Sequence, residues 1–189
     1  MTRGIVEKWH NKAYIFPKNI PKYMGYEQKL LKAKTFADIF DIVKSMALDF
    51  LGVEQAGLLV GLTDLGSYGG SFVGAFYSLN ANAIIINKRP LGSIRQMSPE
   101  LYNPYLFHVM LHEYIHSLGV YDEIQVRQLV YEISRHFFGE NHIATEIASD
   151  LDKFLPNLMH PSEEFESSVQ GIGIEFLPGI DRKNTNYIN

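Results

Sequence analysis

Apolar residues recur with a helical period in one early stretch of the chain and then give way to shorter, strand-like runs. Between residues 36 and 50 they fall every three or four positions, as on the buried face of a helix; they are Phe36, Ile39, Phe40, Val43, Met46, Ala47 and Phe50. Thr35 is a suitable N-cap for this helix, and Gly52 is a suitable stop. Three runs rich in β-branched and aromatic residues follow and predict successive strands of a small sheet: AGLLVGLTDLG (56–66), SFVGAFYS (71–78) and ANAIIINKRP (81–90).

The second half of the chain has the helical period almost throughout. SPELYNPYLFHVMLHEYIHSLG (98–119) predicts a long helix from about Pro104, ended by Gly119. Two further amphipathic stretches follow, DEIQVRQLVYEISRHFFG (122–139) and NHIATEIASDLDKFL (141–155). A sheet followed by helices predicts the α+β class.

The length of 189 residues fits one domain, and we find no repeat or linker that would divide it. We expect an irregular lead-in over about 1–34 with a short strand near Ala13–Phe16, because Pro17 and Pro21 break any longer element. A helix and a mostly antiparallel or mixed sheet should occupy 35–97. The long helix at 98–119 and a helical part at 120–160 follow, and 161–189 is interpreted as a tail.

Composition excludes several classes of function. A net charge of -4 gives no electrostatic basis for binding nucleic acid or an anionic membrane. The absence of cysteine excludes disulfides, thiolate ligands and cysteine nucleophiles, so any metal must be held by histidine, carboxylate or water. No apolar run is long enough to span a bilayer, and the N-terminus lacks the apolar core of a signal peptide. We therefore expect a cytoplasmic protein.

The candidate chemistry lies in LHEYIHSLGVYDE (111–123). On a helix, His112 and His116 lie one turn apart on the same face and can direct their imidazoles at one zinc ion. Glu113 is close enough to reach a water on that ion without binding the metal, so it is a candidate general base. The other positions of this helix are apolar, which predicts that the helix is buried. Buried histidines and a buried glutamate need partners, and this favours a metal site.

A third ligand is needed, and three carboxylates are candidates for it. Gly119 can adopt a left-handed conformation that ends the helix and turns the chain back. Asp122 would then meet the ion from below, and we favour it as the third ligand. Glu146 on a later predicted helix is an alternative, and Glu123 is a weaker one.

His112, Glu113, His116, Gly119 and Asp122 together spell HExxHxxGxxD, which resembles the zinc signature of the metzincin metallopeptidases, in particular the snapalysin-like branch with aspartate at the last position. The resemblance implies a zincin-like fold and a methionine turn below the zinc, for which Met159 in NLMHP is the candidate. It also implies an edge strand that binds the substrate backbone, for which Ala81–Lys88 is the candidate.

These observations predict a zinc-dependent metallopeptidase that hydrolyses peptide or protein substrates with Glu113 as general base. The TEIASD stretch resembles the glutamate helix of the gluzincins, which implies an alternative peptidase with Glu146 as zinc ligand and Asp150 orienting a histidine. A non-catalytic protein with a degenerate zincin fold, in which the metal site is structural or the chain serves interactions, is a third hypothesis.

Overall fold

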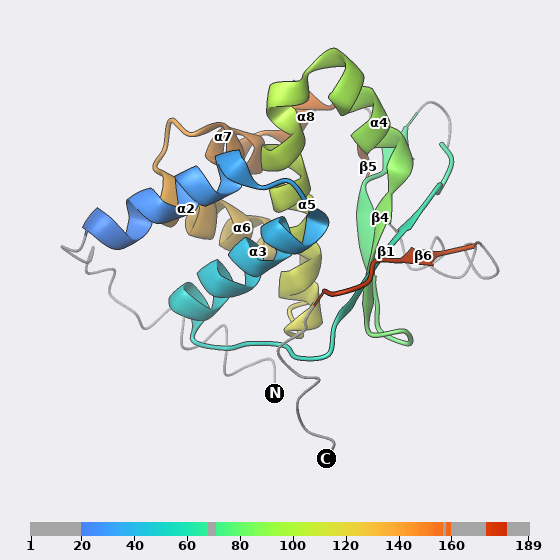
Figure 1. Ribbon diagram of the computed structural model, residues 1–189, viewed down its shortest axis with the longest axis horizontal. Coiled ribbons are helices and arrows are strands. Elements are labelled where there is room, and N and C mark those ends of the chain that lie inside the picture. The colour runs from blue at the N-terminus through green and yellow to red at the C-terminus, as the bar shows by residue number, and fades with distance from the viewer. Residues whose placement is uncertain (1–19, 68–70, 157, 160–172, 181–189) are drawn as a thin grey trace.

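The computed structural model, which describes residues 20–67, 71–156, 158–159 and 173–180, confirms the α+β class (Figure 1). The helices are α2 (Ile20–Lys32), α3 (Phe36–Leu51), α4 (Lys88–Met97), the 3-10 helix η1 (Pro99–Leu101), α5 (Tyr102–Ser117), α6 (Glu123–Phe138), α7 (Ile143–Ser149) and α8 (Leu151–Phe154). The strands are β1 (Leu59–Thr63), β2 (Phe72–Val73), β3 (Ala75–Ser78), β4 (Ala83–Asn87), β5 (Leu158–Met159) and β6 (Glu175–Phe176).

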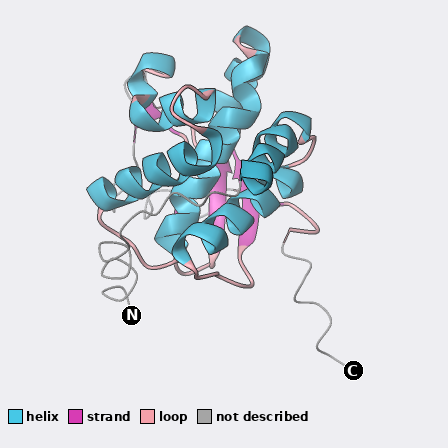
Figure 2. Ribbon diagram, turned by 90° about the vertical axis from the view of Figure 1, so that its left-hand side faces the viewer, coloured by secondary structure: helices cyan, strands magenta, loops and turns pink. Residues whose placement is uncertain are grey.

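The molecule has a helical layer and a sheet layer, with α5 between them. Figure 2 shows the helices in front of the strands, so they cover one face of the sheet. Helix α5 packs against β3 and β4 and also against α3, α6 and α7. The main apolar core therefore surrounds α5, and it includes Phe40, Ile84, Phe107 and Val130. No helix among the described residues is both long and apolar enough to cross a membrane.

Helix α3 forms where the hydrophobic pattern predicts it. The Thr35 hydroxyl accepts a hydrogen bond from the Asp38 N–H, and the Asp38 carboxylate accepts one from the Thr35 N–H, which makes a complete capping box. Gly52 ends the helix with a φ of 74°. The predicted bounds are confirmed because local signals and the apolar period agree here.

Helix α2 lies where the sequence led us to expect an irregular lead-in. Pro21 does not prevent it, because a proline in the first turn removes only an N–H that has no partner within the helix. Tyr26 and Leu30 pack into the core, and the Tyr26 hydroxyl donates to the Asp49 carboxylate at 2.8 Å. The short strand expected near Ala13–Phe16 lies outside the described residues.

The four-stranded sheet has the order β3-β4-β1-β6. Strands β1 and β4 are parallel, whereas β3 pairs antiparallel with β4 and β6 pairs antiparallel with β1. The expectation that Ala81–Lys88 forms an edge strand is wrong: β4 is central and wholly buried, and the strands at the two edges, among the described residues, are β3 and β6. Strand β6 belongs to the segment 161–189, which we had interpreted as a tail.

The side chain of Asn87, at the end of β4, makes hydrogen bonds to three neighbouring segments of the backbone. Its side-chain oxygen accepts hydrogen bonds from the N–H groups of Arg89 and Leu65, at 3.1 and 3.2 Å, and its amide nitrogen donates to the Val73 carbonyl at 2.8 Å. The first of these bonds caps α4, a helix that the sequence did not lead us to expect. One fully buried amide thereby anchors a loop, β2 and the start of α4.

Candidate metal centre

Helix α5 carries the candidate catalytic sequence through the core. Every residue from Pro104 to Ile115 is buried, including His112 and Glu113, which are 4% and 5% exposed. His116 lies one turn after His112 and is partly buried, near the end of the helix at Ser117. The predicted buried helix, with both histidines on one face, is present.

Three side chains converge at the C-terminal end of α5. The Nε2 atoms of His112 and His116 are 3.2 Å apart. Glu123, the first residue of α6, places Oε1 at 3.1 Å from Nε2 of His116 and Oε2 at 3.4 Å from Nε2 of His112. Among the described residues these three form the one group of three or more potential ligands whose donor atoms all lie within 4.8 Å of one another. This donor set is chemically able to hold a metal ion.

The turn after α5 brings Glu123 back to the histidines. Gly119 has a φ of 92°, a left-handed conformation that glycine adopts without steric cost, as the sequence led us to expect. The Val120 carbonyl then lies 2.9 Å from Nδ1 of His116 and accepts its hydrogen. In the neutral imidazole this contact would hold the hydrogen on Nδ1 and leave Nε2 able to bind a metal, the arrangement that metal-binding histidines use.

Asp122, which we favoured as third ligand, is placed differently. Its carboxylate accepts a hydrogen bond of 2.8 Å from the Gln125 N–H and caps α6. The structure thus does not bring Asp122 to the histidines; Glu123 occupies that place. The reason is that α6 begins immediately after the turn, so the carboxylate at the N-cap position is needed by the helix and the next residue faces the cluster.

Glu146 and Asp150 are not members of the cluster. Glu146 on α7 contacts Lys153, with 3.7 Å between Oε2 and Nζ, and Asp150 caps α8 by accepting the Lys153 N–H at 3.1 Å. Met159 belongs to β5, where its backbone pairs with Val73 of β2. The rest of the expected methionine turn, from His160 onward, lies outside the described residues.

Glu113 faces the outer edge of the sheet. The Asn87 N–H of β4 donates to the Gly74 carbonyl just before β3. In an antiparallel pair, the backbone groups of successive residues point alternately toward and away from the partner strand. Gly74 points toward β4, so Tyr77, three residues later, points its N–H away from β4. That N–H donates to the Glu113 carboxylate. Burial raises the pKa of Glu113, while the two nearby histidines and the Tyr77 hydrogen bond oppose this rise. Nothing in the sequence pattern indicated this backbone donor, because the resemblance placed the edge strand at Ala81–Lys88.

The cluster is strongly coupled electrostatically. Hydrogen bonds from His112 and His116 hold the pKa of Glu123 far below its ordinary value, so its carboxylate is charged at neutral pH. Burial lowers the pKa of His116, but the hydrogen bond to Glu123 and the charges of Glu113 and Glu123 outweigh burial and raise it. An anionic carboxylate beside two imidazoles is the kind of environment that attracts a divalent cation.

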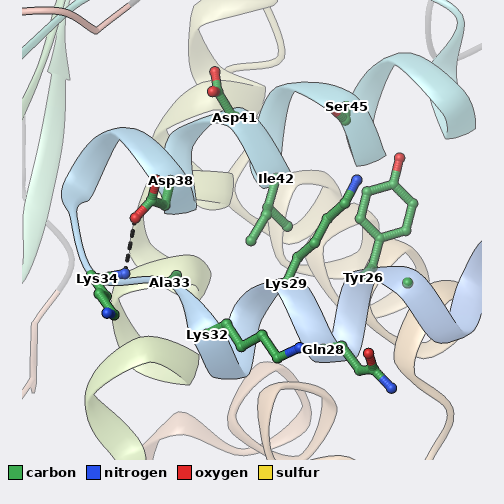
Figure 3. A pocket seen from close by; sticks show the side chains of 11 residues that line it. Tyr26, Gln28, Lys29, Lys32, Ala33, Lys34, Asp38, Asp41, Ile42 and Ser45 are labelled. Atoms are coloured by element: carbon green, nitrogen blue, oxygen red, sulfur yellow. Dashed lines mark hydrogen bonds between the residues drawn. The ribbon is translucent and has the colours of Figure 1, made fainter.

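Two grooves on the described surface contain no cluster residue. One of about 540 Å³ lies between α2 and α3 and is lined by charged side chains that include Lys29, Lys32 and Asp38 (Figure 3). The Asp38 carboxylate, which belongs to the capping box, also accepts the Lys34 N–H at 2.9 Å there. A second groove of about 370 Å³ is lined by residues that include Arg95, Tyr102 and His142. Neither groove competes with the cluster as a catalytic site.

Comparisons of the chain with family models, with curated proteins and with solved structures found no match.

Proposed function

We propose that this protein is a zinc-dependent peptidase in which His112, His116 and Glu123 hold the metal and Glu113 is the general base. The observation that carries the proposal is the convergence of two Nε2 atoms, 3.2 Å apart, on the Glu123 carboxylate, whose two oxygens lie 3.1 and 3.4 Å from them, beside a buried carboxylate on the helix of the histidines. The resemblance to the metzincin signature supports it, with the difference that the third ligand is the residue after the usual position.

The spacing of the donor atoms suits zinc. Ligands at about 2.0–2.1 Å from zinc in a tetrahedral arrangement lie about 3.3–3.4 Å from one another. The separations between the donor atoms of His112, His116 and Glu123 are close to that value. Three protein ligands leave a fourth position for water or substrate, as catalytic zinc sites do. A zinc ion bound here supplies Lewis-acid chemistry, since it acidifies a water molecule and polarises a carbonyl.

Glu113 has the position and the electrostatics of a proton carrier. It takes a proton from the attacking water and holds it at its carboxylate, which burial makes more basic than an exposed glutamate. It then gives that proton to the nitrogen that leaves when the peptide bond breaks. The Tyr77 N–H keeps the carboxylate oriented while it is charged.

A peptide substrate is favoured by the free edge of β3. No described strand pairs with this edge, although the Tyr77 N–H on it already donates to Glu113, and α5 packs against β3. An extended peptide can add to such an edge through main-chain hydrogen bonds, which positions a peptide bond independently of its sequence. Small-molecule substrates would gain nothing from this edge.

The two alternatives have less support. A gluzincin arrangement needs Glu146 at the metal, but Glu146 is not part of the cluster and its side chain is 42% exposed beside Lys153. A closed structural zinc site needs four protein ligands, whereas the group of described residues contains three.

The proposal is tested by replacing the base and keeping the ligands. Zinc-loaded wild type, Glu113→Gln and a surface control, Glu140→Gln, are incubated with a mixture of unstructured peptides, and products are identified by mass spectrometry. We expect Glu113→Gln to retain the zinc content of the wild type and to lose activity by at least about a hundredfold, the usual contribution of a general base. Loss of zinc together with activity would instead make Glu113 a ligand or a structural residue. A zinc-loaded wild type that cleaves no peptide would refute the proposed function.

A further inference from the structure

The groove between α2 and α3 is lined by more positive than negative side chains. It has a volume of about 540 Å³, within the range of pockets that hold small molecules (Figure 3). Three lysines and two aspartates supply its charge: Lys29, Lys32, Lys34, Asp38 and Asp41. The whole chain has a net charge of -4, so the sign of the charge in this groove is opposite to that of the protein.

The two aspartates leave the lysines of the groove without an ion pair. Oδ2 of Asp38 accepts the backbone N–H groups of Lys34 and Thr35, both at 2.9 Å, so this carboxylate is directed at the start of α3. Figure 3 shows the side chain of Asp41 pointing away from α2. Within the described part of the chain, none of the three lysines lies within ion-pair distance of a carboxylate. Their ammonium groups therefore keep their capacity to bind an anion.

Lys29 and Lys32 are placed to act together. They are three residues apart on α2 and so lie on neighbouring positions of one helix face. Nζ of Lys29 lies 5.1 Å from the centre of the Tyr26 ring, a cation–π contact that holds this side chain at the groove. Figure 3 shows the Lys29 side chain reaching across the groove from α2 toward Ser45 of α3. A side chain that is already held in place loses less conformational freedom when a ligand binds.

We propose that this groove binds a small molecule that carries a phosphate group, with Lys29 and Lys32 contacting the phosphate oxygens. A lysine ammonium is a compact charge with three donors and is a common partner of phosphate. A phosphate monoester carries about 1.5–2 negative charges at neutral pH, so it gains more from two ammonium groups than a carboxylate does. An extended polyanion such as nucleic acid is disfavoured, because Asp41 borders the groove and the protein is acidic as a whole.

This binding site is separate from the metal cluster. No residue of the cluster lines the groove, and the inference does not depend on the proposed peptidase function. It can therefore be tested on the full chain without added metal, which also prevents phosphate from binding to a zinc ion during the measurement.

The test is a titration with glycerol 3-phosphate, followed through the backbone amide signals of the protein by NMR at low salt. Glycerol and glycerate serve as comparison ligands, since the first lacks a charge and the second replaces phosphate by a carboxylate. We expect saturable shifts in α2 and α3 with glycerol 3-phosphate, weaker binding of glycerate and none of glycerol. Binding of glycerate as tight as that of glycerol 3-phosphate would overturn the assignment to phosphate.

Matched charge variants separate a site from general attraction of anions. Lys29→Gln and Lys32→Gln should each raise the Kd for glycerol 3-phosphate by about fivefold, the effect of one charge at about 4 Å in water. Lys153→Gln changes the net charge equally, but its side chain is 62% exposed on α8 and lies outside the groove, so it should bind as the wild type does. An equal loss in Lys153→Gln would overturn the inference.

Asp41→Asn provides a test with the opposite sign. Asp41 lines the groove and takes no part in the capping box, so removing its charge should tighten binding of glycerol 3-phosphate by up to about fivefold. Far-UV circular dichroism verifies that each variant is folded. Weaker binding by folded Asp41→Asn, the absence of saturable shifts in the wild type, or shifts confined to other elements would each refute a phosphate site between α2 and α3.

Discussion

The identity of the third ligand gives the sharpest prediction, because the neighbouring carboxylates of Glu123 and Asp122 make different contacts in the structure. Glu123 contacts both imidazoles, whereas Asp122 caps α6 through the Gln125 N–H. Zinc binding to four-ligand peptides releases about 10–16 kcal/mol, or about 3 kcal/mol per ligand. Glu123→Ala should therefore raise the Kd for zinc by at least about a hundredfold. Asp122→Ala should change it by less than about tenfold, the smallest effect usual for groups that only support a ligand.

Stability of the metal-free proteins reports the capping role of Asp122 separately from metal binding. Loss of the N-cap should lower the free energy of unfolding of metal-free Asp122→Ala by about 1 kcal/mol. Zinc affinity is measured by competition with a chromophoric chelator, and stability by urea unfolding of the metal-free proteins, with Glu146→Ala as a control that should match the wild type in affinity. Loss of zinc binding in Asp122→Ala, with Glu123→Ala unaffected, would refute the assignment. Loss in Glu146→Ala alone would favour the gluzincin arrangement.

Three further predictions follow from single contacts. Gly119→Ala strains a residue whose φ is 92° and should lower stability by about 1 kcal/mol; it should also weaken zinc binding in the chelator assay, because it disturbs the carbonyl that orients His116. Burial holds the pKa of His142 below its ordinary value, and its neutral Nδ1 accepts the Ala144 N–H at 3.1 Å. The unfolded chain therefore binds the proton first, so stability is lost as pH falls below about 6.5; His142→Asn, which caps without titrating, should lose less of its urea midpoint between pH 7 and pH 5 than the wild type. Asn87→Ala leaves buried donors and an acceptor without partners and should lower the free energy of unfolding by about 3 kcal/mol in urea titrations.

Local signals made part of the fold predictable. The capping box at Thr35, the αL glycine at Gly52 and the reversal at Gly119 each require only a few neighbouring residues, and each is present. The spacing of His112 and His116 works in the same way, because one helical turn brings them together whatever surrounds the helix. Such features depend on chain geometry over fewer than ten residues, so they can be predicted without knowledge of the fold.

Features that depend on the order of strands were not predictable. The run Ala83–Asn87 is strongly apolar, which is typical of a strand buried on both faces, yet the resemblance led us to place it at the edge. The edge strand next to β4, β3, is short and partly exposed, and its place at the edge follows from the pairing of β4 with β1 on its other side. Helix α4 was missed because its cap, Asn87, also reads as the end of a strand.

The structure places Glu123, and not Asp122, beside the two histidines for a reason that lies in helix physics. A spacing rule counts residues from Gly119, but the side chain that reaches the histidines depends on where the next helix begins. Here α6 begins at Glu123, so the preceding carboxylate satisfies an N–H that would otherwise have no partner. Moving Asp122 to the metal would remove this cap at a cost of about 1 kcal/mol, with Glu123 already in contact with both imidazoles. At this turn, competition between capping and contact with the histidines leaves Asp122 at the cap and Glu123, the first residue of α6, in the cluster.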